Sequence, residues 1–586
     1  MLHNLLSDAE TTRKMQAVIN LLIVSVILAP CEGENSGPPT VHLDQGVLQG
    51  KTEKSRGDRN YSVFYGVPFG KVEKRFEMSK PADGWSGVRM ATENGPECMH
   101  ASLLDGKVTG SEDCLNLDVY TPKLASNDSE KLLPVLVWIY GGGFAAGSNR
   151  VYGGSYFMDE EVILVVINYR VGAFGFLNAG VSSARGNQGM KDQVLALRWV
   201  RDNIHHFSGD KDKVTIFGQS AGGISVSLLT VSPMATGLFS RAIMQSGTAG
   251  MPFFFRGLAG RDVAVKLAQE VDCPSSNMQY LVECLQRLDA KVIVKNTRLN
   301  YEFGHDESSV ALTGPTYETY LPPDNSTGDV FLTESPYDLI VAGKFAKVPI
   351  IMGFVACETC ATVSATLKNP TFIKKLNHQW GRIAPNALFI SNTAEDPALV
   401  SQAIKAHFLG DDYINETIYS KFEALYSDRQ FVHSTRIYAE IYAKHVPVYL
   451  YNFTQMVPIV KFGTATEGEQ TRKVPGHADE ISYIFDGKGE LANYLHRIGK
   501  GHDDEKFSKE TIATWVAFAD TGKPSGPWEN LAWPTFKPDE KGTAKWLRIE
   551  NPPKVEPLPD SWEVNNKFWK GLNIKEFGGT WKSDEL

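Results

Sequence analysis

The sequence predicts one large α/β domain whose central sheet is mostly parallel and covered by helices on both faces. Short, unbroken runs of apolar and β-branched residues recur along the chain, and segments with a helical spacing of apolar residues separate them. Strands that are apolar along their whole length are buried on both faces, which is typical of parallel sheets. No linker rich in proline, glycine or serine divides the 586 residues, so one very large domain is favoured over several ordinary ones.

The expected elements follow from these runs. Buried strands are expected at 132–140 (LLPVLVWIY), 161–169 (EVILVVINY), 213–218 (KVTIFG), 348–354 (VPIIMGF) and 446–453 (VPVYLYNF). The segment 190–207 predicts a helix, because its apolar residues recur at helical spacing. A second helix is expected at 221–231, directly after the third strand. The long stretches between the later strands are expected to be insertions into the domain.

The composition limits the class of partner. Hydrophobic residues make up 42% of the chain and aromatic residues 11%, so a large core can form. The formal net charge is −9, which argues against a nucleic-acid partner, because such a partner requires a basic surface. No low-complexity tract or fixed-period repeat is present.

Residues 1–33 predict a secretory signal peptide. Arg13 and Lys14 precede an apolar run at 17–29, which is short for a membrane span but suits a secretory leader. An uncleaved signal anchor is the alternative, and polar residues inside the run disfavour it. Met15 is an alternative start of translation. No second apolar run has membrane length, so the mature chain is expected to lack a membrane span.

The cysteines and the glycosylation sequons agree with a secretory route. Loss of Cys31 with the leader leaves six of the seven cysteines, and proximity in sequence favours the pairs Cys98–Cys114, Cys273–Cys284 and Cys357–Cys360. Free buried thiols are the alternative for the last pair. No second cysteine or histidine pair has zinc-ligand spacing, so no metal is expected. Sequons occur at Asn60, Asn127, Asn325, Asn415 and Asn452.

A candidate nucleophile lies in the segment 214–223, VTIFGQSAGG. Ser220 is the serine of a G-x-S-x-G pattern that follows an expected strand and precedes an expected helix. Such a turn forces the serine into a strained conformation and exposes its hydroxyl beyond the strand. The amide of Ala221 then points with the helix N-terminus toward developing negative charge. An ordinary serine in a loop is the alternative, and the strand–turn–helix context disfavours it.

Three consecutive glycines at 141–143 end another expected strand. Their amides are not shielded by side chains and can donate hydrogen bonds to an oxyanion. The same residues also fit the G-x-G-x-x-A pattern of a dinucleotide site, with acidic residues at 159–161. That alternative requires a helix directly after the glycines, and the glycine-rich, aromatic segment that follows is a poor helix start. The oxyanion interpretation is therefore favoured.

A serine nucleophile needs a base and an acid that orients the base, in the chain order serine, acid, histidine in α/β-hydrolases. His477 lies in a glycine-led loop, VPGHADEISYIF, whereas the other histidines downstream of Ser220 lie mostly in polar or helix-like segments. Glu358 follows the expected strand at 348–354, where a carboxylate can reach an imidazole. A solvated loop glutamate is the alternative for Glu358.

Taken together, these segments resemble the type-B carboxylesterase/cholinesterase family of α/β-hydrolases, from about Val41 to the C-terminal region. The matching segments include FYGVPFG (64–70), SEDCLNLDVYTP (111–122), YGGGF (140–144), INYRVGAFGFL (167–177), GNQGMKDQVLALRWVRDNI (186–204), VTIFGQSAGG, RAIMQSGT (241–248), GKFAKVPIIMG (343–353) and GHADEISYIF (476–485). The second of these is a specific signature.

The resemblance implies an α/β-hydrolase fold and a serine esterase that needs no cofactor and no metal. It implies Ser220 as nucleophile, Glu358 as acid and His477 as base. It also implies an oxyanion hole formed by the amides of Gly142, Gly143 and Ala221, and it supports the disulfides Cys98–Cys114 and Cys273–Cys284. The expected partner is a small-molecule ester.

Four departures from the family pattern bear on the substrate. Tyr140 replaces the histidine that often precedes the glycines, Gln219 replaces the glutamate that commonly precedes the nucleophile, and Thr359 replaces the glycine that usually follows the acid. No tryptophan lies between Cys98 and Cys114, where cholinesterases stack a quaternary ammonium group. We therefore expect a neutral, apolar ester. Insect carboxylesterases, among them juvenile hormone esterases, are the most similar group, and PFFFR (252–256) is a candidate acyl-pocket segment.

Two alternatives concern the class and the location of the protein. Some members of the family are adhesion proteins that lost the serine, but Ser220, Glu358 and His477 are all present here.

The last four residues, 583–586 (SDEL), resemble an endoplasmic-reticulum retention signal. Residence in the lumen of the endoplasmic reticulum is therefore favoured and secretion is the alternative, with a catalytic domain expected at 34–582.

Overall fold

The computed structural model describes nine segments of the chain, which are residues 37–103, 105–124, 131–252, 260–297, 314–318, 329–456, 474–488, 495–538 and 544–576. From Pro39 onward they belong to one compact unit. The predicted leader, the sequons at Asn127 and Asn325, most of the segment 252–256 and the C-terminal SDEL lie outside the described residues.

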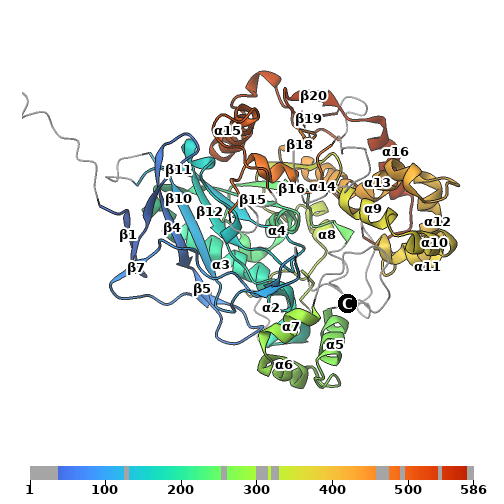
Figure 1. Ribbon diagram of the computed structural model, residues 1–586, viewed down its shortest axis with the longest axis horizontal. Helices are drawn as coiled ribbons and strands as arrows, with labels where there is room; N and C mark the ends of the chain where they lie inside the picture. Colours follow the sequence, from blue (N-terminus) through green and yellow to red (C-terminus); the bar gives the residue numbers. More distant parts are fainter. Residues whose placement is uncertain are drawn as a thin grey trace, which may run out of the picture. The chain divides into compact units, whose positions relative to one another are not determined.

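An eleven-stranded sheet forms the centre of the unit, in the order β20-β19-β18-β17-β16-β15-β11-β12-β10-β4-β3 (Figure 1). In chain order the strands are β3 (Lys51–Lys54), β4 (Asn60–Pro68), β10 (Asn116–Thr121), β11 (Leu133–Ile139), β12 (Ile163–Ile167), β15 (Gly209–Gln219), β16 (Arg241–Gln245), β17 (Ile350–Val355), β18 (Val448–Phe453), β19 (Lys545–Ile549) and β20 (Lys554–Pro557). The six pairs from β12 to β19 are parallel, and the outer pairs at both edges are antiparallel. The predicted mostly parallel sheet is confirmed.

The buried strands explain why the sheet forms in this order. β11, β12 and β17 consist almost entirely of apolar residues that are buried along their whole length, and β15 is buried from Val214 to Gln219. Such strands must be covered on both faces. Helix α4 (Ala221–Val231) packs against β11, β15 and β16, and α3 (Gln188–Asn203) packs beside α4. Helix α15 (Glu505–Thr521) contacts β11 and β15 from the other face (Figure 1).

Two groups of helices are inserted between strands, as expected from the long segments there. Helices α5 (Gly260–Glu270), α6 (Met278–Arg287) and α7 (Ala290–Asn296) follow β16 and share a small core with earlier segments of the chain, among them Ala173–Leu177. Helices α9 (Cys360–Leu367), α10 (Pro370–His378), α11 (Trp380–Ala387), α12 (Pro397–Phe408) and α13 (Tyr419–Ser427) follow β17 and share a second small core with α16 (Asp560–Lys570). The two groups lie apart from each other in Figure 1.

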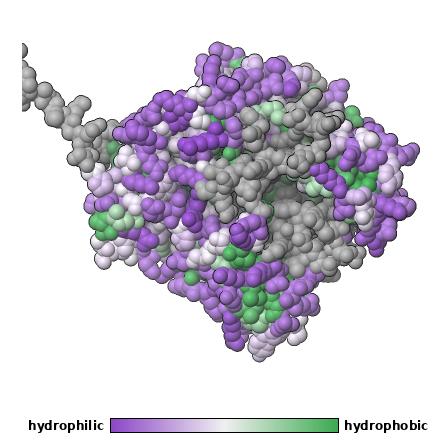
Figure 2. Space-filling model, in the orientation of Figure 1, coloured by the Kyte–Doolittle hydropathy of each residue, from purple (hydrophilic) through white to green (hydrophobic). Residues whose placement is uncertain are grey.

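The surface seen in Figure 2 is mostly hydrophilic, and its apolar residues gather in small patches, one of them over α5–α7 at the bottom of the view. Among the described residues, no helix combines the length and the apolar composition that crossing a membrane requires.

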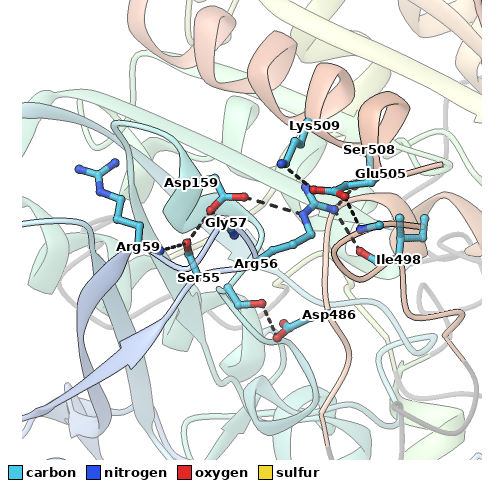
Figure 3. Close-up of polar contacts among 12 residues, drawn as sticks. Ser55, Arg56, Gly57, Arg59, Asp159, Asp486, Ile498, Glu505, Ser508 and Lys509 are labelled. Carbon is cyan, nitrogen blue, oxygen red and sulfur yellow. Dashed lines mark hydrogen bonds and ion pairs between the residues drawn. The ribbon is translucent and has the colours of Figure 1, made fainter. Parts of the chain in front are cut away.

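A buried arginine attaches the N-terminal strands to the C-terminal helix α15 (Figure 3). Arg56 lies in the turn between β3 and β4, and only 2% of its side chain is exposed. Its guanidinium donates to the hydroxyl of Ser508 at 2.8 Å and to the carbonyl oxygen of Ile498 at 3.3 Å, and it lies 3.8 Å from the carboxylate of Asp159. It also stacks 4.0 Å from the centre of the Tyr156 ring. A buried charge with these partners fixes the position of both segments.

Helix α4 lies so close to β11 that Gly222, in its first turn, has no room for a side chain. A Cβ on Gly222 would lie 1.9 Å from the carbonyl oxygen of Ile139, and a Cβ on Gly218 would lie 2.6 Å from the carbonyl group of Gly222. Both distances fall below the 3.0 Å limit of real Cβ contacts. The obstructing atoms belong to the backbone, so they cannot move without displacing a strand or a helix.

This contact predicts a large effect of one methyl group. Gly222→Ala is expected to lower the free energy of unfolding by about 3 kcal/mol or more, because an added methyl group in a filled core forces the backbone apart. Gly381→Ala is the matched control, since Gly381 lies inside α11 and a Cβ there would meet its nearest atom at 3.7 Å. The control is expected to be neutral or stabilising by about 0.5–1 kcal/mol. Denaturant unfolding followed by circular dichroism measures both, and equal midpoints would contradict the expectation.

Candidate active site

Ser220 lies at the turn between β15 and α4, as the sequence predicts. Its backbone has φ 57° and ψ −123°, a combination that residues with a side chain rarely adopt. Its amide donates to the carbonyl oxygen of Gln245 at 2.8 Å, which holds the turn against β16. The serine is half-buried. A strained serine at the carboxyl end of a central strand is the arrangement that presents a hydroxyl to a substrate.

The glycine loop 141–143 lies against this turn. β11 and β15 are neighbouring parallel strands, so the residues that follow them lie at the same edge of the sheet. A Cβ on Gly141 would lie 3.0 Å from the Cβ of Ser220 and 2.6 Å from the carbonyl oxygen of Gln219. Among the described residues, none of the amides of Gly142, Gly143 and Ala221 donates a hydrogen bond. The loop therefore brings unshielded amides next to the serine.

No helix begins directly after these glycines. The chain continues through turns to two short 3-10 segments, η1 (Asn149–Val151) and η2 (Phe157–Asp159), within the described residues 131–171. The dinucleotide alternative required a helix N-terminus at this point to hold a pyrophosphate. The local structure therefore disagrees with that alternative.

Two tyrosines fix the base of the glycine loop. The rings of Tyr140 and Tyr169 are stacked with centroids 4.5 Å apart and an interplanar angle of 20°. Each hydroxyl donates to the backbone carbonyl oxygen of the other residue, at 2.9 Å and 2.8 Å. Both side chains are fully buried. The residue before the glycines is thus part of a reciprocal pair that ties the loop after β11 to the segment after β12.

Glu358 and His477 meet beyond the ends of β17 and β18. The Nδ1 atom of His477 lies 2.6 Å from Oε2 of Glu358, and the amide of Val355 donates to Oε1 at 2.9 Å. The Glu358 side chain is completely buried, whereas 29% of the His477 side chain is exposed. The amide of Cys357 also donates to the carbonyl oxygen of Pro475 at 3.1 Å, which joins the two loops directly. A solvated position for Glu358 is therefore wrong.

This pairing changes the proton affinity of the imidazole. Burial alone lowers the pKa of His477, but the negative charge of Glu358 and its hydrogen bond outweigh burial, and the net pKa is raised above the ordinary value. When the neutral ring donates its Nδ1 proton to Glu358, the Nε2 atom is left as an acceptor. In this structure the side-chain amide nitrogen of Gln219 lies 3.1 Å from that Nε2 atom. The residue before the nucleophile is therefore in direct contact with the candidate base.

Two further residues interact with the histidine, one by ring contact and one electrostatically, and neither was expected from the sequence. Phe431 belongs to a π-helical turn, η7 (Asp428–Val432), and its ring centroid lies 4.8 Å from that of His477. Glu480 is buried three residues after the histidine and accepts a hydrogen bond from Gln245 at 3.4 Å. Burial and the charge of Glu358 raise the pKa of Glu480 to about 8. Only the place of Glu480 in the segment GHADEISYIF could have indicated it from the sequence.

The structure also places the remaining candidate residues. It contains the disulfides Cys98–Cys114, Cys273–Cys284 and Cys357–Cys360, and the last pair is thereby bonded rather than free.

Three of the sequons lie in the described part of the chain. Asn60 is exposed at the start of β4, and Asn415 is half-buried before a 3-10 turn. Asn452 differs from both, because it lies inside β18 and its side-chain oxygen is buried. An interior strand leaves little space for a glycan.

Comparison with known proteins shows the family of the chain. The family model described as "Carboxylesterase family" matches residues 37–566. A carboxylic ester hydrolase from Bombus ignitus is 31% identical over 96% of this chain and 98% of its own length. A juvenile hormone esterase from Tribolium castaneum is 34% identical over 84% of this chain and 85% of its own length.

A solved structure shares the fold. The crystal structure of juvenile hormone esterase from Manduca sexta, with OTFP covalently attached, superposes with a TM-score of 0.78 at 24% identity and covers 91% of this chain and 99% of its own. The predicted α/β-hydrolase fold is confirmed. The chain belongs to the carboxylesterase family, a family of carboxylic ester hydrolases with the α/β-hydrolase fold.

Proposed function

We propose that the protein is a serine esterase in which Ser220 is the nucleophile, His477 the general base and Glu358 the acid that orients the base. The observation that carries this proposal is the hydrogen bond of 2.6 Å between His477 Nδ1 and the buried Glu358. It leaves the Nε2 atom of a partly exposed imidazole as the acceptor, and in this structure that atom contacts the side chain of Gln219, the residue directly before a serine held on a strained turn. A buried carboxylate is needed to stabilise the imidazolium that forms when the serine loses its proton.

The reaction proceeds in two steps on this geometry. His477 takes the proton of Ser220 while the serine oxygen attacks the ester carbonyl, and the amides of Gly142, Gly143 and Ala221 donate to the developing oxyanion. The protonated imidazole then gives its proton to the leaving alcohol, and an acyl-serine remains. Water, deprotonated by the same imidazole, attacks the acyl-serine and releases the acid. Gln219 must release Nε2 before the histidine can accept the serine proton.

The substrate is proposed to be a neutral, apolar ester of the xenobiotic, odorant or lipid-like kind. Gln219 places an uncharged amide beside the base, where many relatives have a carboxylate, and no tryptophan lies between Cys98 and Cys114 to stack on a cation. Hydrolysis of a juvenile hormone ester is the second candidate, because the relative from Tribolium castaneum bears that name. A non-catalytic adhesion role is disfavoured, because nucleophile, base and acid are all present and correctly ordered.

The location of the protein is proposed to be the secretory pathway. The bonded cysteine pairs suit an oxidising compartment. The leader expected at 1–33 supports entry into that compartment, and the SDEL sequence at 583–586 favours retention in the lumen of the endoplasmic reticulum over secretion.

Loss of the nucleophile is the first test. Ser220→Ala is expected to lower kcat for an aryl ester roughly 10⁴-fold or more and to abolish covalent labelling by an organophosphate, because no other hydroxyl occupies the turn. The small change should leave the unfolding midpoint unaltered, which circular dichroism verifies. Unchanged turnover or labelling in the folded variant would refute the assignment of Ser220.

Loss of the acid tests the pair and predicts a pH effect. The base works only when neutral, so kcat/KM of the native enzyme should fall as the pH drops through the raised pKa of His477. Glu358→Gln removes the charge that raises this pKa, whereas burial still lowers it. The acidic limb of the profile should therefore move to lower pH, and the plateau of kcat should fall about 10²–10⁴-fold. An acidic limb that moves to higher pH would contradict this origin of the shift.

Charge discrimination tests the substrate class. Acetylcholine and its uncharged isostere, in which a tert-butyl group replaces the trimethylammonium group, have nearly the same shape. The native enzyme is expected to hydrolyse the uncharged ester with the higher kcat/KM, since a cation finds no carboxylate beside the base. Gln219→Glu should narrow that preference, because it restores a negative charge near the leaving group. Equal kcat/KM values for both esters in the native enzyme would contradict the expectation.

A further inference from the structure

The segment Cys357–Cys360 combines three features around the candidate acid. Glu358 and Thr359 lie between two cysteines whose sulfur atoms are bonded to each other. Cys357 pairs with Gly476 in a parallel β-bridge, so one end of this small ring is attached to the residue before His477. Cys360 is the first residue of α9, so the other end is attached to the inserted helices.

We propose that the Cys357–Cys360 disulfide and the Thr359–Ser427 contact together form a positioning device that holds the Glu358 carboxylate against His477. The inference rests on the proposed esterase function and deepens it, because it assigns a role in the same reaction to residues that touch neither substrate nor the reacting atoms.

The disulfide fixes the backbone on both sides of the acid. A bond between residues three apart closes a ring that leaves few conformations for Glu358 and Thr359. The amide of Cys357 bonded to Pro475, and the β-bridge to Gly476, hold this ring beside the histidine loop. The acid and the base are therefore carried by segments that are attached to each other independently of the side-chain hydrogen bond.

Thr359 supplies the second attachment. Its amide donates to the hydroxyl of Ser427 at 3.2 Å, and its own hydroxyl lies 3.2 Å from the same atom. The hydroxyl also donates to the carboxylate of Glu423 at 3.4 Å, and Ser427 in turn donates to that carboxylate. Ser427 ends α13, directly before the π-helical turn that carries Phe431 onto the histidine ring. One helix end thus supports the acid through Thr359 and the base through Phe431.

The replacement of glycine by Thr359 gives this arrangement a physical reason. The family usually has a glycine after the acid, and a glycine has no side chain that could hold the backbone. Thr359 has a hydroxyl group that can hold the backbone here, provided that the hydroxyl group itself has fixed partners. The hydroxyl network and the disulfide provide that fixation. Glu423 also approaches both sulfur atoms, in a cluster of ligand atoms within 4.8 Å of one another, but sulfurs bonded to each other are not available as metal ligands.

The test compares removal of this disulfide with removal of another. In Cys357→Ala/Cys360→Ala, kcat per active site is expected to fall roughly tenfold to a hundredfold at nearly constant KM, because a displacement of about 1 Å in a catalytic group can cost a factor of about 100. The acidic limb of the pH profile should move to lower pH, as for Glu358→Gln. Cys273→Ala/Cys284→Ala is the matched control, since that bond lies among α5–α7, and it should change the unfolding midpoint but neither kcat nor the pH profile.

Active sites are counted by the end point of organophosphate labelling, so misfolded molecules do not enter kcat. The same pair of substitutions is then made in Glu358→Gln. If the disulfide acts through Glu358, its removal from the Glu358→Gln variant should lower kcat little further. A further loss of kcat as large as the one in the native protein overturns the proposal, and so does an unchanged kcat when the cysteines are replaced in the native protein. If the cysteine variant does not fold, Ser427→Ala tests the proposal instead. It should lower kcat in the native protein and lower kcat little further in the Glu358→Gln variant.

A spectroscopic measurement separates this inference from the function. The downfield proton resonance of His477 Nδ1 reports the hydrogen bond to Glu358 without any substrate. The resonance is expected to move upfield or broaden in Cys357→Ala/Cys360→Ala and to stay in place in the control pair, and an unmoved resonance overturns the proposal. Failure of the esterase function would instead be seen as absent turnover in the native protein, whatever this resonance does.

Discussion

Backbone contact between the first turn of α4 and the end of β11 determines where the whole site lies. The missing side chain of Gly222 lets the helix rest against the carbonyl group of Ile139, and no other residue fits this space. With the helix this close, the chain must turn within a single residue, and Ser220 takes up the strained conformation. The strain is maintained by the sheet, since the Ser220 amide is bonded to Gln245 on the neighbouring strand.

Parallel strands then bring the other groups to the same edge. β11 delivers the glycine loop, β15 the serine and β17 the glutamate, while the histidine loop follows β18 and is joined to the loop after β17 at Cys357. Residues separated by more than a hundred positions along the chain thereby meet in one place. The positions of these groups relative to one another depend on the register of the sheet. Because the hydrophobic core fixes where the strands end, it also fixes the geometry of the site.

The sequence predicted the central elements well, because these depend on local pattern. The helix expected at 221–231 has those bounds, and the helix expected at 190–207 ends at Asn203 and continues as a 3-10 turn. Strand β16 was not predicted as an element of its own, since its five residues include an arginine and a glutamine. The antiparallel edge strands have no long apolar run, so the sequence pattern does not predict them either.

The site was less accessible to sequence patterns than the fold. Ser220 could be located because its turn has a local signature, whereas Glu358 was supported mainly by resemblance. Its burial and its bond to His477 arise from contacts 119 positions apart, which no local pattern encodes. The same holds for Phe431 and Glu480, whose contacts with the site depend on a π-helical turn and on the packing of a loop.

The reciprocal tyrosine pair has a consequence for how a substrate is accommodated. Tyr140 and Tyr169 each satisfy the other's backbone, so the two loops they belong to move together or not at all. A loop that is locked in this way offers its amides in a fixed place and cannot adapt to the shape of an acyl group. The shape of an ester must therefore be accommodated by residues outside this loop.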